Sequence, residues 1–184
     1  MLTNEDRISY LLNVYFGDYL KDPTLSAVER AYLDLARTQH GFSRDIEKQH
    51  IQEQRKSFLV AKIRDIGENQ IESQDNFDEY HKDVMLDLKR MSQASFTFGQ
   101  AQKWVNMSLK YCLIIKPEVF AKNMAFYHVP IDNIVLAELP DYGFSGKWSK
   151  LNNYDDYIYF QNWFRKKYSE QAPILTELKL WYKK

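Results

Sequence analysis

The sequence has a single cysteine, Cys112, and only six glycines and five prolines in 184 residues. One cysteine excludes an internal disulfide framework and a cysteine-rich zinc site, which favours a reducing, cytosolic setting. The longest unbroken apolar runs, such as residues 112–115 and 134–137, are far too short to cross a bilayer. No basic start is followed by an apolar stretch. We therefore expect a cytoplasmic protein with no secretory signal and no membrane partner.

Net charge is also absent, because 25 Lys and Arg balance 25 Asp and Glu. The distribution is uneven: residues 1–96 hold 13 basic and 17 acidic side chains, whereas residues 97–184 hold 12 and 8. A basic half can attract phosphate. Ordinary solvated faces explain the same asymmetry, so charge alone does not identify a partner.

Apolar residues recur at helical spacing nearly throughout, and no strand-like alternation stands out. We expect helices over residues 4–20, 26–39, 43–66, 77–93, 99–115, 154–168 and 173–182, with short ones after Pro117 and up to Leu139. This pattern predicts a compact all-α protein of eight or nine helices. The polar stretch 67–76 is the best linker, which would divide an N-terminal helical region, 1–70, from a C-terminal one, 71–184, within one compact unit.

Two of these helices carry unusual polar stripes. In the helix over 99–115, Lys103, Asn106 and Lys110 form a polar, basic stripe beside an apolar one. In the helix over 43–66, residues 43–57 are polar and charged. That half of the helix is expected to face solvent or a protein partner.

Common catalytic signatures are missing. The four histidines lie far apart and form no metal-binding pair, so no metal site is predicted. There is no phosphate-binding loop, no dinucleotide-binding glycine turn and no nucleophile elbow, and we expect no cofactor. Cys112 lies on an apolar helix face, where a small buried side chain is the better interpretation than a nucleophile.

Three segments of the second half occur in a characteristic order. They are GQAQKWVN at 99–106, VPIDNIVL at 129–136, and LTELKLWY at 175–182, which follows the basic run 165–167. Together they resemble the C-terminal half of the helix-hairpin-helix DNA glycosylases, particularly the 8-oxoguanine glycosylases. The resemblance covers about 80 residues. It implies a glycosylase-like core in the C-terminal region and cleavage of the N-glycosidic bond of a modified or damaged base, with lyase activity.

The resemblance assigns two catalytic residues. Lys103 matches the lysine that forms a Schiff base with the sugar, and Asp132 matches the aspartate that stabilises the developing positive charge. If the pair is catalytic, the fold must bring both residues together across a cleft open to solvent. The non-catalytic alternatives are that Lys103 is an ordinary surface lysine and that Asp132 is a helix N-cap.

DNA is the partner that this interpretation implies. The candidate nucleic-acid-binding residues are Gly99, Gln100, Gln102, Asn106, Lys110 and His128. Gly99 stands where the family's hairpin has its glycines, although Ala101 replaces the second one. Gln100 and Gln102 could read a base edge or be plain exposed glutamines. His128 could assist base recognition or form a hydrogen bond across a turn.

In a rival interpretation, the chain has the glycosylase-like fold but no catalytic activity. The neutral net charge, the altered hairpin glycines and the polar helix 43–57 favour a non-catalytic interaction protein. An all-α protein unrelated to glycosylases is a third possibility. The distance between Lys103 and Asp132 in the folded chain is the observation that separates these interpretations.

Overall fold

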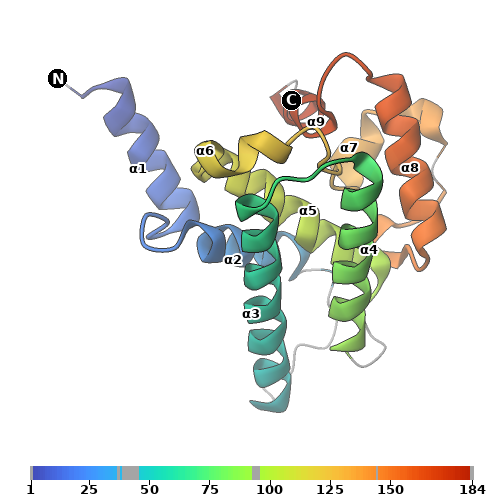
Figure 1. Cartoon of the computed structure of the whole chain (residues 1–184), viewed down its shortest axis with the longest axis horizontal. Coiled ribbons are helices and arrows are strands. Elements are labelled where there is room, and N and C mark those ends of the chain that lie inside the picture. Colours follow the sequence, from blue (N-terminus) through green and yellow to red (C-terminus); the bar gives the residue numbers. More distant parts are fainter. Residues whose placement is uncertain (1, 37, 39–45, 93–95, 144, 183–184) are drawn as a thin grey trace.

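The chain folds into helices joined by short connections (Figure 1), as described by a computed structural model. The structure describes residues 2–36, 38, 46–92, 96–143 and 145–182. Its α-helices are α1 (Asn4–Phe16), α2 (Pro23–Ala36), α3 (Ile46–Glu68), α4 (Gln74–Arg90), α5 (Phe98–Ile115), α6 (Pro117–Phe120), α7 (Asn133–Ala137), α8 (Tyr154–Lys167) and α9 (Pro173–Tyr182). Short 3₁₀ turns cover Ala121–Asn123 (η1), Pro140–Tyr142 (η2) and Trp148–Lys150 (η3). These described ranges contain no strand, so the predicted all-α fold and its helix count are confirmed.

Helix α5 forms the centre of the molecule (Figure 1). Every residue from Phe98 to Leu113 is buried. Helix α2 packs along α5 more extensively than any other pair of helices packs, and α3, α4, α6 and α8 also contact α5. The apolar stripe predicted for this helix, including Trp104 and Cys112, is fully buried. One core therefore joins residues from both predicted regions, while the division at residue 70 stays a prediction.

The first two helices differ from the predicted ranges for local reasons. Helix α1 begins after a capping box between Thr3 and Asp6 but ends at Phe16, because Gly17 adopts a positive φ of 70°. Helix α2 begins at Pro23, three residues before the predicted start. Proline suits the first helical position, and Asp22 accepts a hydrogen bond from the amide of Leu25.

Helices α3 and α4 run antiparallel beside α5 (Figure 1). The predicted start of the polar helix, residues 43–45, lies outside the described residues. From residue 49 onward its polar part is largely exposed, apart from the buried Arg55, which donates a hydrogen bond to Ser92 at 2.9 Å. A protein partner for that surface stays a prediction. Helix α4 begins at Gln74, three residues before the predicted start, because Ser73 is its N-cap.

No helix in the described ranges combines the length and the apolar character needed to cross a bilayer.

Candidate functional site

Lys103 and Asp132 meet although 29 residues separate them in the sequence. Nζ of Lys103, in the second turn of α5, forms an ion pair with Oδ2 of Asp132. The other oxygen of Asp132, Oδ1, accepts the amides of Ile134 and Val135 at 3.0 and 2.8 Å, so this carboxylate is the N-cap of α7. The carboxylate of Asp132 therefore caps a helix, as the N-cap alternative requires. It also pairs with Lys103, as the catalytic assignment requires.

The pair does not line a cleft open to solvent, and that expectation is wrong. The side chains of Lys103 and Asp132 are only 5% and 8% exposed. The ring of Trp148, itself buried, lies 5.9 Å from Nζ of Lys103. The loop around η3 therefore covers this end of α5.

Gly99 explains how that loop approaches α5 so closely. A Cβ atom at residue 99 would lie 1.9 Å from the backbone oxygen of Trp148, and the amide of Gly99 donates to the oxygen of Leu151 at 2.9 Å. Only glycine leaves room for this contact. Gly99 is buried and packs against the loop, so the structure accounts for it by packing.

Two glutamines fix the extended segment that leads to Asp132. Gln102 donates to the oxygen of Ile131 at 2.8 Å and accepts its amide at 3.0 Å. Gln161 on α8 makes the same pair of hydrogen bonds with Val129, at 2.8 and 2.9 Å. This clamp, together with the cap, determines where the carboxylate of Asp132 lies relative to Lys103.

Gln100 and Gln102 are therefore not the exposed glutamines that the sequence suggested. Gln100 completes a capping box with Thr97 and donates to the oxygen of Thr38 at 3.0 Å. Gln102 is fully buried. Both amides are used within the protein in this conformation, and contact with a base stays a prediction that would require their release.

A second buried ion pair lies two turns further along α5. Nζ of Lys110 donates to Oε1 of Glu177 on α9 at 2.8 Å, and the two side chains are 5% and 0% exposed. The ring of Trp181, one turn after Glu177, lies 4.7 Å from the same Nζ and is 38% exposed. Trp181 is thus a partly exposed aromatic surface above a buried charge.

Glu177 and Trp181 entered the sequence analysis only as part of a matching segment. Two spacings carried the missing signal: Lys103 and Lys110 are seven residues apart, and Glu177 and Trp181 are four apart. Both spacings place side chains on one helix face. Equal numbers of basic and acidic residues do not reveal which lysine forms an ion pair with which carboxylate.

The two ion pairs influence each other. Burial lowers the pKa of Lys110, opposed by Glu177, and the charge of Lys103 lowers it further. Burial raises the pKa of Glu177, opposed by Lys110, and the charge of Asp132 raises it further. We refer to Lys103, Asp132, Lys110 and Glu177 as the ion-pair cluster.

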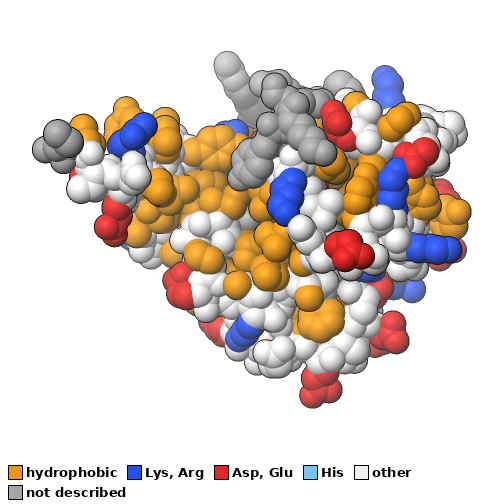
Figure 2. All heavy atoms as spheres, turned by 90° about the horizontal axis from the view of Figure 1, so that it is seen from above, with side chains coloured by type: hydrophobic (Ala, Val, Ile, Leu, Met, Phe, Trp, Pro, Cys, Tyr) orange, Lys and Arg blue, Asp and Glu red, His pale blue; other side chains and the backbone are white. Residues whose placement is uncertain are grey.

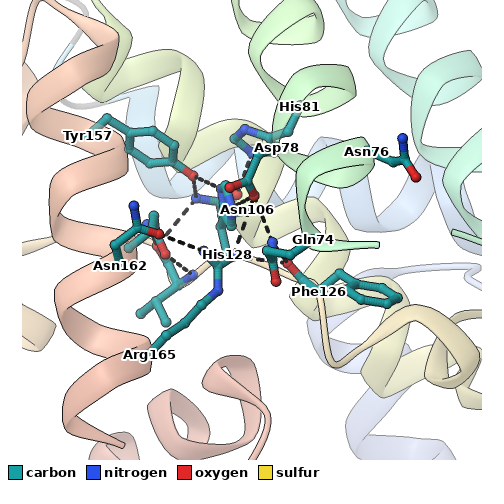
Figure 3. A network of polar contacts seen from close by, with 12 residues as sticks. Gln74, Asn76, Asp78, His81, Asn106, Phe126, His128, Tyr157, Asn162 and Arg165 are labelled. Atoms are coloured by element: carbon teal, nitrogen blue, oxygen red, sulfur yellow. Dashed lines mark hydrogen bonds and ion pairs between the residues drawn. The ribbon is translucent and has the colours of Figure 1, made fainter. Parts of the chain in front are cut away.

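Asn106 and His128 belong to a different group of side chains (Figure 3). Asn106 accepts a hydrogen bond from Nε2 of His81 at 2.8 Å and donates to the hydroxyl of Tyr157 at 3.0 Å. His128 donates from Nε2 to Asp78 at 2.7 Å and accepts the hydroxyl of Tyr157 at Nδ1, at 2.5 Å. These five residues form the histidine network, which ties α4, α5 and α8 to the segment before α7.

Both histidines of this network are held neutral. Burial lowers the pKa of His81 well below 6.5, and the adjacent His128 lowers it further; their ring centroids are 4.6 Å apart. Burial and then the charge of Arg165 lower the pKa of His128. Within the described structure, Nδ1 of His81 is buried without a hydrogen-bond partner, so a proton there would have no acceptor. His128 thus contacts distant helices, not merely the other side of a turn.

Two cavities of about 300 Å³ each lie at α3 and α4 and share Tyr80 in their walls. No residue of the ion-pair cluster lines either of them. The described residues contain no group of three or more His, Cys, Asp or Glu side chains that could hold a metal ion.

No protein-family model matches the chain, and neither the curated proteins nor the solved structures contain a match to it.

Proposed function

We propose that the chain is a DNA base-excision glycosylase with lyase activity, in which Lys103 is the nucleophile and Asp132 its carboxylate partner. The observation that supports this proposal most is the contact between Lys103 and Asp132. The carboxylate lies at a helix N-terminus, and the amine lies on a buried helix beside it. A lysine nucleophile needs an aspartate at this position to stabilise positive charge on the sugar.

The chemistry follows from these two groups. Lys103 transfers its ammonium proton, for which Oδ2 of Asp132 is the adjacent acceptor, and its amine attacks C1′ of the deoxyribose. The bond from C1′ to the base nitrogen breaks, and the base leaves with the electron pair and takes up the proton that Asp132 received, which restores the carboxylate beside the sugar. Opening of the sugar ring gives a Schiff base between C1′ and Nζ. Loss of a proton from C2′ then expels the 3′ phosphate, and water hydrolyses the Schiff base to free the lysine.

The second ion pair would recognise the base. A flipped base needs an aromatic surface on which to stack and polar groups that read its edge. Trp181 supplies a partly exposed ring, Nζ of Lys110 lies 4.7 Å from the centre of that ring, and Glu177 accepts a hydrogen bond from the same amine. Lys110 lies two turns from Lys103 on the same face of α5.

Substrate can reach Lys103 only if its cover moves. Trp148 closes the site from the η3 loop, and that loop is bordered by Lys147 and Lys150, both exposed. Phosphates attracted to these two lysines would bring DNA to the segment that must open. Replacing Lys147 and Lys150 together by alanine should weaken DNA binding at low salt and reduce its salt dependence.

Trapping with borohydride tests the proposal, because borohydride reduces a Schiff base to a stable amine. DNA with an abasic site should become covalently attached to the protein, and DNA with 8-oxoguanine should follow if that base is a substrate. Lys103→Gln should abolish both adducts. Lys110→Gln should still trap abasic DNA, which has no base to recognise, and Lys82→Gln, which changes an exposed lysine of α4, should behave as wild type.

The second candidate function is that of a non-catalytic interaction protein with a glycosylase-like fold. Nearly complete burial of both ion pairs supports it, since buried charges that pair with each other also occur in structural roles. If a folded wild-type protein forms no adduct on either DNA, this candidate replaces the first.

A further inference from the structure

From Ile8 to Phe16, helix α1 carries seven large apolar side chains, yet only one side of the helix packs against the body. It extends from the body as an arm, and Figure 2 shows hydrophobic side chains along that arm. Its inner side is anchored: Phe16 is buried, and the hydroxyl of Tyr15 contacts that of Tyr111 at 3.0 Å. The exposed large apolar residues in and next to α1 are Leu2, Ile8, Tyr10, Leu11, Val14, Tyr15 and Leu20, which are 45–73% exposed.

Such a helix is expected to be covered in the working protein. Large apolar side chains on more than one side of a helix are typical of an element that is covered on more than one side. Seven large side chains exposed to this extent amount to several hundred Å², the order of the roughly 800 Å² that each partner of a standard interface buries. Elsewhere in the described chain the exposed large apolar residues are four and scattered: Leu33, Ile114, Tyr159 and Trp181.

Two exposed charged residues, one near each end of this surface, indicate which kind of partner would cover it. Arg7 lies near the N-terminal end of α1 and Asp18 just beyond its C-terminal end. Both are exposed, and neither side chain has an ion-pair partner within the described residues. In a second copy that runs in the opposite direction, each Arg7 approaches the Asp18 of the other copy, so both unpaired side chains gain an oppositely charged partner.

We propose that α1 pairs antiparallel with α1 of a second copy of this chain. In a two-fold pair with Leu11 opposite Val14 of the other copy, Arg7 lies near Asp18, which follows the C-terminal end of the other α1. The arrangement occurs twice by symmetry, so both ends of the apolar strip are closed by opposite charges.

The charge of α1 disfavours the other occupants. Its first turn holds Glu5 and Asp6, and Arg7 is its one basic residue. A helix that binds anionic lipid or nucleic acid carries a basic polar face instead. The pairing is independent of the proposed glycosylase activity, and either can fail without the other.

Sedimentation velocity over a range of protein concentrations tests the pairing. We expect a reversible dimer that Leu11→Glu converts to monomer, with at least a hundredfold weaker association and unchanged helix content. Leu33→Glu is the matched control, because Leu33 is 58% exposed but lies on α2, and it should dimerise as wild type.

Charge reversal tests the direction of pairing. Arg7→Asp or Asp18→Arg alone places like charges together twice per dimer and should weaken association about tenfold. The two changes in one chain restore both pairs and should return the affinity to within about threefold of wild type.

A wild-type protein that stays monomeric overturns the proposal, and so does a dimer that Leu11→Glu leaves intact. Equal weakening by the single and double charge variants contradicts the antiparallel direction. Binding of the monomer to vesicles of anionic or neutral lipid, lost in Leu11→Glu, would assign the surface to a membrane instead.

Discussion

The polar stripe of α5 contributes to two buried groups of polar side chains, which compensate for the loss of contact with water in different ways. At Asn106, the histidine network joins neutral side chains from four segments of the chain by hydrogen bonds, which leave only Nδ1 of His81 unpaired among its ring nitrogens. At Lys103 and Lys110, the ion-pair cluster buries four charges, which their partners compensate together with two backbone amides at Asp132. Neutral hydrogen-bonded groups can stabilise a core, whereas buried ion pairs are on average no better for stability than apolar residues of similar size.

This difference indicates which group serves the structure and which serves a function. The histidine network connects helices and leaves no charge inside except at its edge, where Asp78 and Arg165 reach the surface. The ion-pair cluster costs desolvation, and its second pair lies below a partly exposed tryptophan. We therefore infer that the histidine network serves folding and the ion-pair cluster the proposed chemistry, while DNA binding by Asn106 and His128 stays a prediction.

The largest effect should come from breaking one buried pair. Glu177→Gln leaves the charge of Lys110 buried without its partner, which should lower the free energy of unfolding by about 3–5 kcal/mol. Glu29→Gln breaks the exposed pair with Lys56 and should cost no more than about 1 kcal/mol. Urea denaturation at pH 7 measures both. Equal losses for the two variants would remove the distinction between buried and exposed pairs in this protein.

In the histidine network, Tyr157→Phe should cost about 1–3 kcal/mol. The ring shape is kept, but Nδ1 of His128 and Nδ2 of Asn106 each lose a partner at a buried position. If this network serves folding alone, the folded variant should still form the borohydride adduct at the wild-type rate. A variant that keeps its stability but loses the adduct would place Tyr157 in the chemistry instead.

Acid should weaken the histidine network. Because burial lowers the pKa of His81 and His128 below the unfolded value of 6.5, the unfolded chain binds more protons at low pH. Stability is then complete above pH 6.5 and falls below it, by up to about 1.4 kcal/mol per pH unit for each histidine.

Urea midpoints at pH 7.5, 6.5 and 5.5 measure that slope. Charged or titratable groups around the two rings are Asp78, Arg165 and Tyr157. His81→Gln should remove about half of the loss, whereas His50→Gln, which changes an exposed ring, should leave it unchanged. A flat profile between pH 7.5 and 5.5 would show that the rings are not held neutral by the fold.

The smallest effect should come from removing both members of one ion pair. Lys110→Met combined with Glu177→Leu replaces two buried charges by apolar side chains of similar size, and stability should stay within about 1 kcal/mol of wild type. The same protein should lose preference for DNA that carries a damaged base, while it still traps abasic DNA. A loss as large as that of Glu177→Gln would make the pair structural.

The sequence predicted some helices closely and missed others for identifiable reasons. The ranges of α5, α8 and α9 follow from strong apolar spacing between clear end signals. The start of α2 was missed because Pro23 at the first helical position reads equally well as a break. The early end of α1 depends on one conformation at Gly17, which no spacing reveals.

The sequence predicted which residues belong to the candidate site better than it predicted that these residues are buried. Lys103 and Asp132 were found through a resemblance, and the fold brings them into contact. Polar spacing on the helix over 99–115 suggested an exposed basic stripe, but contacts from α7, α8 and α9 cover it. Glu177 lies 67 residues from Lys110, and such distant contacts decide burial without leaving a local pattern.

The central claim is that Lys103 forms a covalent intermediate with DNA, and peptide mapping of the borohydride adduct tests it most directly. Wild-type protein is reduced on DNA with an abasic site, digested and sequenced by mass spectrometry. The account predicts the sugar remnant on Lys103 alone, in the peptide that contains Trp104. An adduct on a surface lysine or on the N-terminal amine, with Lys103 unmodified, would contradict it.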